Sequence, residues 1–323
     1  MSDTAKESLK ILLSQASSDS ARLTAIESVS KDILVKVLPN VEKGGKNANY
    51  FFHAIGLLLQ NHEKNVSQFD RNLVRRALVA KFALNLPAII NGLGLPESIL
   101  ALYPARLNLL SDHLKHNEND AYDVHCEYFQ KDLQFVLGMW VPVSNTHALN
   151  LNYYFLYRTV IRSLLRPGNL NAIVRFLIVN GTGRWYAFHI DTRNLIDFNE
   201  SGWDSSYTRI TDLLERNNSI RGMIATSWLL DPQLLSISPH LAYIQLRPQD
   251  RGAILIRHCS TPEDTELATM KSKTRRRLYE ERKYIPVCYS YLWPRKDMIA
   301  WSRSAKQSIG WHDAKRVRKY MLC

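Results

Sequence analysis

The sequence predicts an α+β protein: an all-helical first half, residues 1–168, followed by a mixed α/β sheet domain, residues 169–323. The 323 residues are 46% hydrophobic and 22% charged, which is the balance of a globular chain. Apolar residues recur at helical spacing through the first half, and short β-rich runs with turn signals begin after Pro167-Gly168. The length suits about two domains, each large enough to bury a core.

Helices are expected throughout the first half, because no alternating run of β-branched residues interrupts it. Ser18-Asp19-Ser20 offers side chains that can cap the second helix. Pro87 is expected to end one helix and Pro142 to break another. The predicted helical segments are residues 9–13, 26–37, 51–60, 73–86, a helix opened by Pro96-Glu97, 121–137 and 153–165.

The second half predicts a hairpin followed by alternating helices and strands. Asn180-Gly181-Thr182-Gly183 is a hairpin turn signal, because Asn-Gly accepts the positive φ angles of a tight turn. Thr261-Pro262 is a helix start, with Thr261 as the N-cap. The predicted strands are residues 173–179, 185–190, 220–228, 254–259 and 287–292, and the predicted helices are residues 204–216, 261–283 and 294–305.

Nearly all of the net charge of +12 lies at the end of the chain. From residue 270 onward there are 15 Lys and Arg residues against four acidic residues. Such a concentration attracts anionic partners, such as a phosphate-bearing cofactor, an acidic carrier protein, nucleic acid or an anionic membrane surface. A solvated basic helix with a basic tail is the alternative interpretation. No known nucleic-acid-binding signature is present, so charge is the only support for nucleic acid.

Several protein classes lack their sequence signatures. There is no dinucleotide-binding or phosphate-binding glycine loop, and no zinc-protease or α/β-hydrolase motif. No metal site is expected. The four cysteines are too far apart for a zinc knuckle and are expected to be reduced thiols. Without a signal peptide or an apolar run of about 20 residues, we expect a soluble cytoplasmic protein with no membrane span.

The candidate catalytic residues come from the strand at residues 185–191. Alternation along this strand puts His189 and Asp191 on one face, where they can form an acid–base pair. A half-buried histidine with a local hydrogen bond is the alternative interpretation. Glu200, a few residues later, is a second candidate base.

Three tryptophans lie beside turns and charged residues, each at the end of a strand or the start of a helix. They are Trp203, Trp228 and Trp293, and Asp231 follows the second of them. Ligand crevices in open α/β sheets gather at strand ends, so these residues are candidates for a shared substrate site. Simple anchoring of loops on the core is the alternative. The densest basic run, residues 271–279, contains Arg275 and Arg276, and Lys283 follows on the same predicted helix; such side chains suit phosphate or carboxylate.

The second half resembles an uncharacterised family of bacterial proteins. The residues that carry this resemblance are 198–203, Gly222-Met223, Ser227-Trp228, Asp231-Pro232, Ile237-Ser238-Pro239, Thr274-Arg275-Arg276 and Trp293-Pro294-Arg295. This similarity implies no activity.

The second half is also similar, more weakly, to the GNAT acyltransferase superfamily. Gln249-Asp250-Arg251-Gly252 matches the first positions of the acyl-CoA loop of that superfamily, and Ile254 departs from it. In that superfamily, the loop lies between a strand and a helix, and the first N–H groups of the helix hold the pyrophosphate. The resemblance implies Arg251 and Gly252 as cofactor-binding residues and a GNAT-like sheet.

These features predict an acyltransferase-like enzyme that moves an acyl group from a thioester on CoA or on an acidic carrier protein to an amine. His189 or Glu200 is the expected general base, and Trp203 and Trp228 are expected to line the acyl or acceptor pocket. Arg275, Arg276 and Lys283 are expected to attract the donor. The alternative is a non-enzymatic binding protein that uses its helices for a protein partner and its basic end for nucleic acid or other anions.

Overall fold

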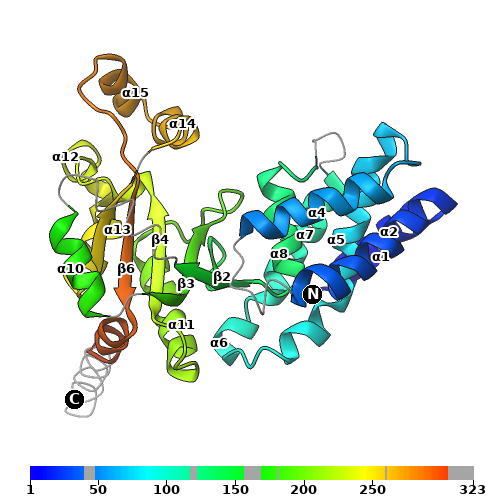
Figure 1. Ribbon diagram of the computed structural model, residues 1–323, viewed down its shortest axis with the longest axis horizontal. Helices are drawn as coiled ribbons and strands as arrows, with labels where there is room; N and C mark the ends of the chain where they lie inside the picture. The colour runs from blue at the N-terminus through cyan, green and yellow to red at the C-terminus, as the bar shows by residue number, and fades with distance from the viewer. Residues whose placement is uncertain (40–47, 117–121, 156–168, 180–181, 259, 305–323) are drawn as a thin grey trace, which may run out of the picture. The chain divides into compact units, whose positions relative to one another are not determined.

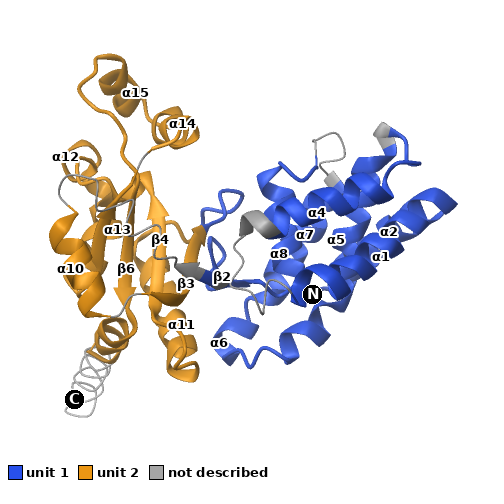
Figure 2. Cartoon of the chain, in the orientation of Figure 1, with its two compact units in different colours: residues 1–154, 190–196 blue, residues 155–189, 197–323 orange. Residues whose placement is uncertain are grey.

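The computed structural model describes residues 1–39, 48–116, 122–155, 169–179, 182–258 and 260–304. The chain forms two compact units, which are coloured separately in Figure 2. Unit 1 comprises residues 1–154 and 190–196, and unit 2 comprises residues 155–189 and 197–323. The chain therefore returns to unit 1 for one short segment, which sequence patterns did not indicate. The described residues combine helices with parallel and antiparallel strands, which confirms the α+β class.

Unit 1 is built from helices that bury one apolar face each. In the first helix, for example, Leu9, Leu12 and Ala16 are buried, and this helix packs against α5 and α7. Asp19 caps the second helix by accepting a hydrogen bond from the Arg22 N–H, as predicted. The elements are α1 (Asp3–Ser17), α2 (Ser20–Asp32), η1 (Ile33–Val37), α4 (Ala48–His62), α5 (Gln68–Asn91), α6 (Glu97–Leu100), α7 (Tyr103–His116) and α8 (Glu127–Val136).

Two predictions for the first half are wrong. Helix α5 continues through Pro87, because its apolar packing tolerates the loss of one backbone hydrogen bond. Strands β1 (Trp140–Pro142) and β2 (His147–Phe155) pair antiparallel where only helices were predicted. Apart from Val141, neither strand contains a β-branched residue, so the β-rich runs that marked strands in the second half are absent here. The rest of the predicted helix 153–165 lies outside the described residues.

Unit 2 holds a mixed sheet, in which the strand order is β3-β4-β6-β5 (Figure 1). Strand β3 is parallel to β4, and β6 is antiparallel to both β4 and β5. The strands are β3 (Gly183–Ile190), β4 (Gly222–Ser227), β5 (Ile254–Arg257) and β6 (Tyr289–Pro294). The helices are α10 (Leu170–Ile178), α11 (Glu200–Arg216), η2 (Trp228–Leu230), α12 (Leu234–Ile237), η3 (Pro239–Leu241), α13 (Ala242–Gln249), α14 (Pro262–Met270), α15 (Lys273–Glu280) and residues 295–304.

The strand predicted at residues 173–179 is wrong, because this segment belongs to helix α10. Ile173 and Phe176 are buried, whereas Val174 and Leu177 are apolar but exposed. The helix is therefore apolar on both faces, and a short apolar run does not distinguish a helix from a strand. The turn signal Asn180-Gly181 lies outside the described residues.

The helix predicted for residues 261–283 is two helices, and its start is confirmed. Thr261 caps α14 and exchanges hydrogen bonds with Asp264 in a capping box, with Pro262 in the first turn. A second helix, α15, then begins, because the Ser272 side chain caps it by accepting a hydrogen bond from the Arg275 N–H. Figure 1 shows that α14 and α15 project from the end of the sheet where β4 ends.

Candidate functional site

The parallel pairing of β3 with β4 stops before either strand ends. The register runs from Tyr186 opposite Met223 to Phe188 opposite Ala225, whereas β3 continues to Ile190 and β4 to Ser227. Strand β4 stays paired with β6 over these last residues, so it is the β3–β4 pair that ends. The carboxyl ends of two parallel strands thus diverge, and this is where open α/β sheets commonly bind ligands.

His189 lies next to the last paired residue of β3 and is half-buried. Glu200, the first residue of α11, is exposed and forms an ion pair with Arg247 of α13. Arg247 also contacts Asp204, one turn further along α11. Because the Glu200 side chain is engaged by the Arg247 guanidinium, we take His189 as the candidate base.

Tyr243 of α13 also lies near the start of α11, and the sequence analysis did not identify it. Its ring centroid is 6.3 Å from that of Trp203, and its hydroxyl is half-buried. Burial raises the pKa of Tyr243, with a smaller contribution from the Glu200 charge, so its hydroxyl stays protonated at neutral pH. Nothing in the sequence around Tyr243 separates it from other aromatic residues.

Two of the predicted tryptophans belong to the core of unit 2. Trp203 and Trp293 are both buried, and both contact Tyr207, with ring centroids 5.8 and 5.1 Å away. The indole N–H of Trp293 donates to the Arg251 carbonyl oxygen at 3.0 Å. These two residues therefore support the sheet, as in the alternative interpretation, and Trp203 does so from the first turn of α11.

Trp228 and Asp231 follow the end of β4 directly. The Arg275 guanidinium carbon lies 4.9 Å from the centre of the half-buried Trp228 ring. Asp231 is fully buried and accepts the backbone N–H groups of Gln233 and Val287 at 3.0 and 2.9 Å. Burial raises the pKa of Asp231, and these hydrogen bonds oppose the rise. Trp228 and Asp231 therefore stabilise the segments of the chain that meet at this end of the sheet.

The three basic residues predicted to attract an anion differ in their surroundings. Arg275 is buried and donates to the Ala268 carbonyl oxygen and to the Ser238 hydroxyl, so it is a structural residue. Arg276 and Lys283 are exposed. The Arg276 side chain reaches the Met270 carbonyl oxygen at 2.8 Å, and Lys283 pairs with Glu281 at 2.8 Å.

The predicted cofactor loop at Arg251 and Gly252 has the wrong neighbours for a pyrophosphate site. It follows helix α13 and leads into strand β5, so no helix begins at this loop to supply free N–H groups. The similarity to the acyl-CoA loop is therefore a coincidence of sequence. Gly252 is required for its φ of +96° in the turn between α13 and β5.

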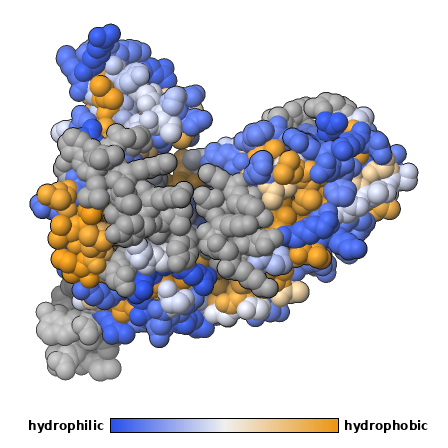
Figure 3. Space-filling view, in the orientation of Figure 1, coloured by the Kyte–Doolittle hydropathy of each residue, from blue (hydrophilic) through white to orange (hydrophobic). Residues whose placement is uncertain are grey.

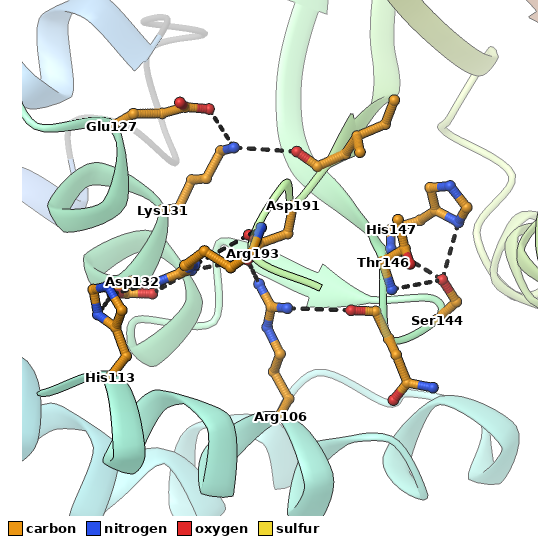
Figure 4. Close-up of polar contacts among 12 residues, drawn as sticks. Arg106, His113, Glu127, Lys131, Asp132, Ser144, Thr146, His147, Asp191 and Arg193 are labelled. Atoms are coloured by element: carbon orange, nitrogen blue, oxygen red, sulfur yellow. Dashed lines mark hydrogen bonds and ion pairs between the residues drawn. The ribbon is translucent and has the colours of Figure 1, made fainter. Parts of the chain in front are cut away.

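Unit 1 contains a buried network of ion pairs, which Figure 4 shows. Arg193 reaches between two buried carboxylates, at 2.7 Å from Asp132 and 2.8 Å from Asp191. Arg106 forms a second ion pair with Asp191. Lys131 donates to the Ile190 carbonyl oxygen at 3.1 Å. The carboxylate of Asp191, a predicted catalytic residue, is thus held by two guanidinium groups.

The network keeps the Asp191 carboxylate charged. Burial alone would raise the pKa of Asp191, but hydrogen bonds from Arg193 and the charges of Arg106 and Arg193 outweigh burial and hold that pKa well below its ordinary value. Burial lowers the pKa of His113, which lies 3.7 Å from Asp132. Asp191 is therefore a poor proton acceptor, and its position indicates that it fixes the segment 190–196 in unit 1.

Comparison with known proteins matches no family model, no curated protein and no solved structure. Within the described ranges, no group of three or more His, Cys, Asp or Glu side chains has the arrangement of a metal site. None of the helices in the described part of the chain has both the length and the apolar character that a membrane crossing requires.

Proposed function

We propose that this protein is an acyltransferase that moves an acyl group from a pantetheine thioester to an amine. The observation that carries the proposal is the early end of the β3–β4 pairing at Phe188 and Ala225. Two diverging parallel strands present backbone N–H and C=O groups toward the space between them. A pantetheine arm is extended and carries amide groups, so it can hydrogen-bond there in the manner of a short added strand.

The order of elements in unit 2 also supports this function. Strand β3, helix α11, strand β4, helix α13 and strands β5 and β6 follow one another in an order compatible with the GNAT acyltransferase fold. The first turn of α11 lies close to the end of the β3–β4 pairing, because the ring centroid of Trp203 in that turn is 5.1 Å from that of Phe188, the last paired residue of β3. Gly202 allows the tight approach of that turn, because a Cβ atom there would lie 2.2 Å from the Asp197 carbonyl oxygen.

The chemistry needs one proton acceptor and one proton donor. The amine nitrogen attacks the thioester carbonyl carbon, and His189 accepts the proton that the nitrogen loses. The C–S bond then breaks, while the newly formed C–N bond remains as the amide bond. The leaving thiolate takes a proton from the Tyr243 hydroxyl. His189 returns its proton through water to the tyrosinate. The products are an amide and a free thiol.

The test is an acyl-transfer assay that measures thiol release and the mass gained by an amine acceptor. The variant His189→Gln should lose about 10²- to 10⁴-fold of the rate, which is the usual contribution of a general base. His240→Gln is a matched control, because His240 is an exposed histidine of the same unit. A wild-type protein that releases no thiol from any acyl-pantetheine donor, and whose melting temperature no donor raises, contradicts the proposal.

The non-enzymatic alternative is favoured by one observation, the exposed aromatic ring of Tyr279 among the cations of α15. Basic side chains with an aromatic ring for stacking are typical of proteins that bind single-stranded nucleic acid. Such binding should weaken steeply as salt rises. The variant His189→Gln should leave it unchanged, so the same variant distinguishes the two functions.

A further inference from the structure

Helix α15 and the residues that flank it present a basic surface that the core of unit 2 does not use. We call residues 271–283 the basic surface. Within it, Glu280 and Glu281 are the acidic residues, and Glu281 pairs with Arg277 and Lys283. The preceding helix α14 has no basic residue and exposes Glu263 and Glu266. The side chains that carry its positive charge are exposed: Lys271, Lys273, Arg276, Arg277, Arg282 and Lys283. Figure 1 shows the two helices projecting beyond the sheet, where such charges meet solvent on several sides.

The basic surface is fixed in place by the one arginine of this run that is buried. Arg275 donates to the Ser238 hydroxyl at 3.0 Å and packs its guanidinium on the Trp228 ring. Trp228 directly follows Ser227, the last residue of β4. Helix α14 also contacts η2, which Trp228 begins. The basic surface is therefore anchored to the end of β4 at which the β3–β4 pairing opens.

Exposed apolar side chains lie among and beside these cations. About half of the surface of Leu267 and of Met270 is accessible, as is 64% of Ile285. In Figure 3, hydrophobic residues interrupt the hydrophilic surface of this projection. A phosphate backbone makes little use of such aliphatic groups, whereas a protein interface has apolar and Met side chains at its centre and charges at its rim.

We infer that the acyl donor of the proposed reaction is an acidic carrier protein that docks on the basic surface and passes its pantetheine arm to the open end of β3 and β4. This inference rests on the proposed function. Carboxylates of the carrier complement the six cations, and its apolar residues cover Leu267, Met270 and Ile285. A free small-molecule donor needs a concave site that buries most of its surface, and a projecting pair of helices does not provide one.

The experiment compares one acyl group on two donors, a holo acyl carrier protein and CoA, with the full-length protein. The test variant is Lys271→Glu/Lys273→Glu. The control is Lys296→Glu/Arg303→Glu, which changes the charge equally in the helix that follows β6, at the opposite end of the sheet. The measurements are kcat/KM for each donor, and binding of a fluorescent carrier by anisotropy, at low and high salt.

The test variant should lose about 10- to 100-fold of kcat/KM with the carrier at low salt, because opposite charges govern the rate of encounter. The loss should shrink at high salt, and the control should change less than about 2-fold. With acyl-CoA, both variants should match the wild type.

Three other results have different meanings. If acyl-CoA serves as well as the carrier and the test variant is unaffected, the carrier inference is wrong while the acyltransferase stands. If neither donor reacts, the proposed function is wrong and the inference falls with it. If the carrier does not bind but a single-stranded oligonucleotide does, and the test variant abolishes that binding, the basic surface belongs to nucleic acid and the inference is overturned.

Discussion

Positively charged side chains have opposite surroundings in the two units. In unit 1, Arg106 and Arg193 lie against the buried carboxylates of Asp132 and Asp191, so their charges are neutralised locally. In α15 of unit 2, Arg276 and Arg277 are exposed beside other cations, and the ion pair of Arg277 with Glu281, at 3.8 Å, is open to solvent. The first arrangement holds a fold together, and the second leaves a field directed at solvent.

Buried charges of the first kind stabilise the fold, whereas exposed charges of the second kind can bind a partner. Amino-acid composition does not distinguish these two kinds of charge, because it counts a buried arginine and an exposed arginine alike. What distinguishes them is whether a carboxylate lies within a few ångströms of the cation and is buried away from water. If one partner of such a buried ion pair is removed, the other partner is left as an uncompensated charge. Substitutions in the two regions should therefore differ in what they disturb, stability in unit 1 and binding in unit 2.

The largest effect is expected for Arg193→Ala. This variant leaves Asp132 without its guanidinium partner and removes one of two from Asp191. Removing one partner of a buried ion pair costs about 3–5 kcal/mol of unfolding free energy. Urea denaturation followed by circular dichroism measures the loss. A loss below about 1 kcal/mol, the value of exposed pairs, would mean that the network is no more than a surface feature.

Acid should weaken the same network. The folded-state pKa of Asp191 is lowered, so its contribution to stability is present above the unfolded-state pKa, about 3.9, and is lost as the pH falls through that value toward the folded one. The free energy of unfolding should decline below about pH 5. Asp191→Asn should be less stable at neutral pH and decline less steeply than the wild type. Parallel slopes for the two proteins would contradict this assignment.

Elements whose signals are local were predictable from sequence. The start of α14 follows from Thr261, Pro262 and Asp264, which are neighbours in the chain and form the cap among themselves. The strand segments near residues 222–227, 254–257 and 289–294 were also predicted, because short β-rich runs are bounded there by Gly, Pro and charged residues.

Features that depend on distant residues were not predictable. Arg106 and Asp191 are 85 residues apart, and neither has a sequence neighbour that indicates the other. The strands β1 and β2 were missed because, apart from Val141, they contain none of the β-branched residues that mark strands elsewhere in the chain. The predicted pairing of His189 with Asp191 relied on alternation along one strand, whereas the chain passes from unit 2 into unit 1 between these two residues.

Within one run of arginines, the comparison can be made with the sequence context held constant. Arg275→Ala should destabilise unit 2 by about 2–3 kcal/mol, because it removes buried, charge-assisted hydrogen bonds to Ala268 and Ser238 and the packing on Trp228. Arg275→Lys should restore only part of this, since an ammonium group lacks the planar stacking. Chemical denaturation followed by intrinsic tryptophan fluorescence measures the change. An unchanged midpoint would show that Arg275 does not anchor the basic surface.

The smallest effect on stability is expected next to it, for Arg276→Ala. Arg276 is exposed, and the loss of one exposed contact to the Met270 carbonyl oxygen should change the free energy of unfolding by no more than about 0.5 kcal/mol. The same variant should nonetheless weaken binding of an acidic partner and reduce its salt dependence, because it removes one charge from the field. Equal destabilisation by Arg275→Ala and Arg276→Ala would refute the distinction between anchoring and exposed charge. A stable Arg276→Ala protein with weaker, less salt-sensitive binding would extend that distinction from two units to two adjacent residues.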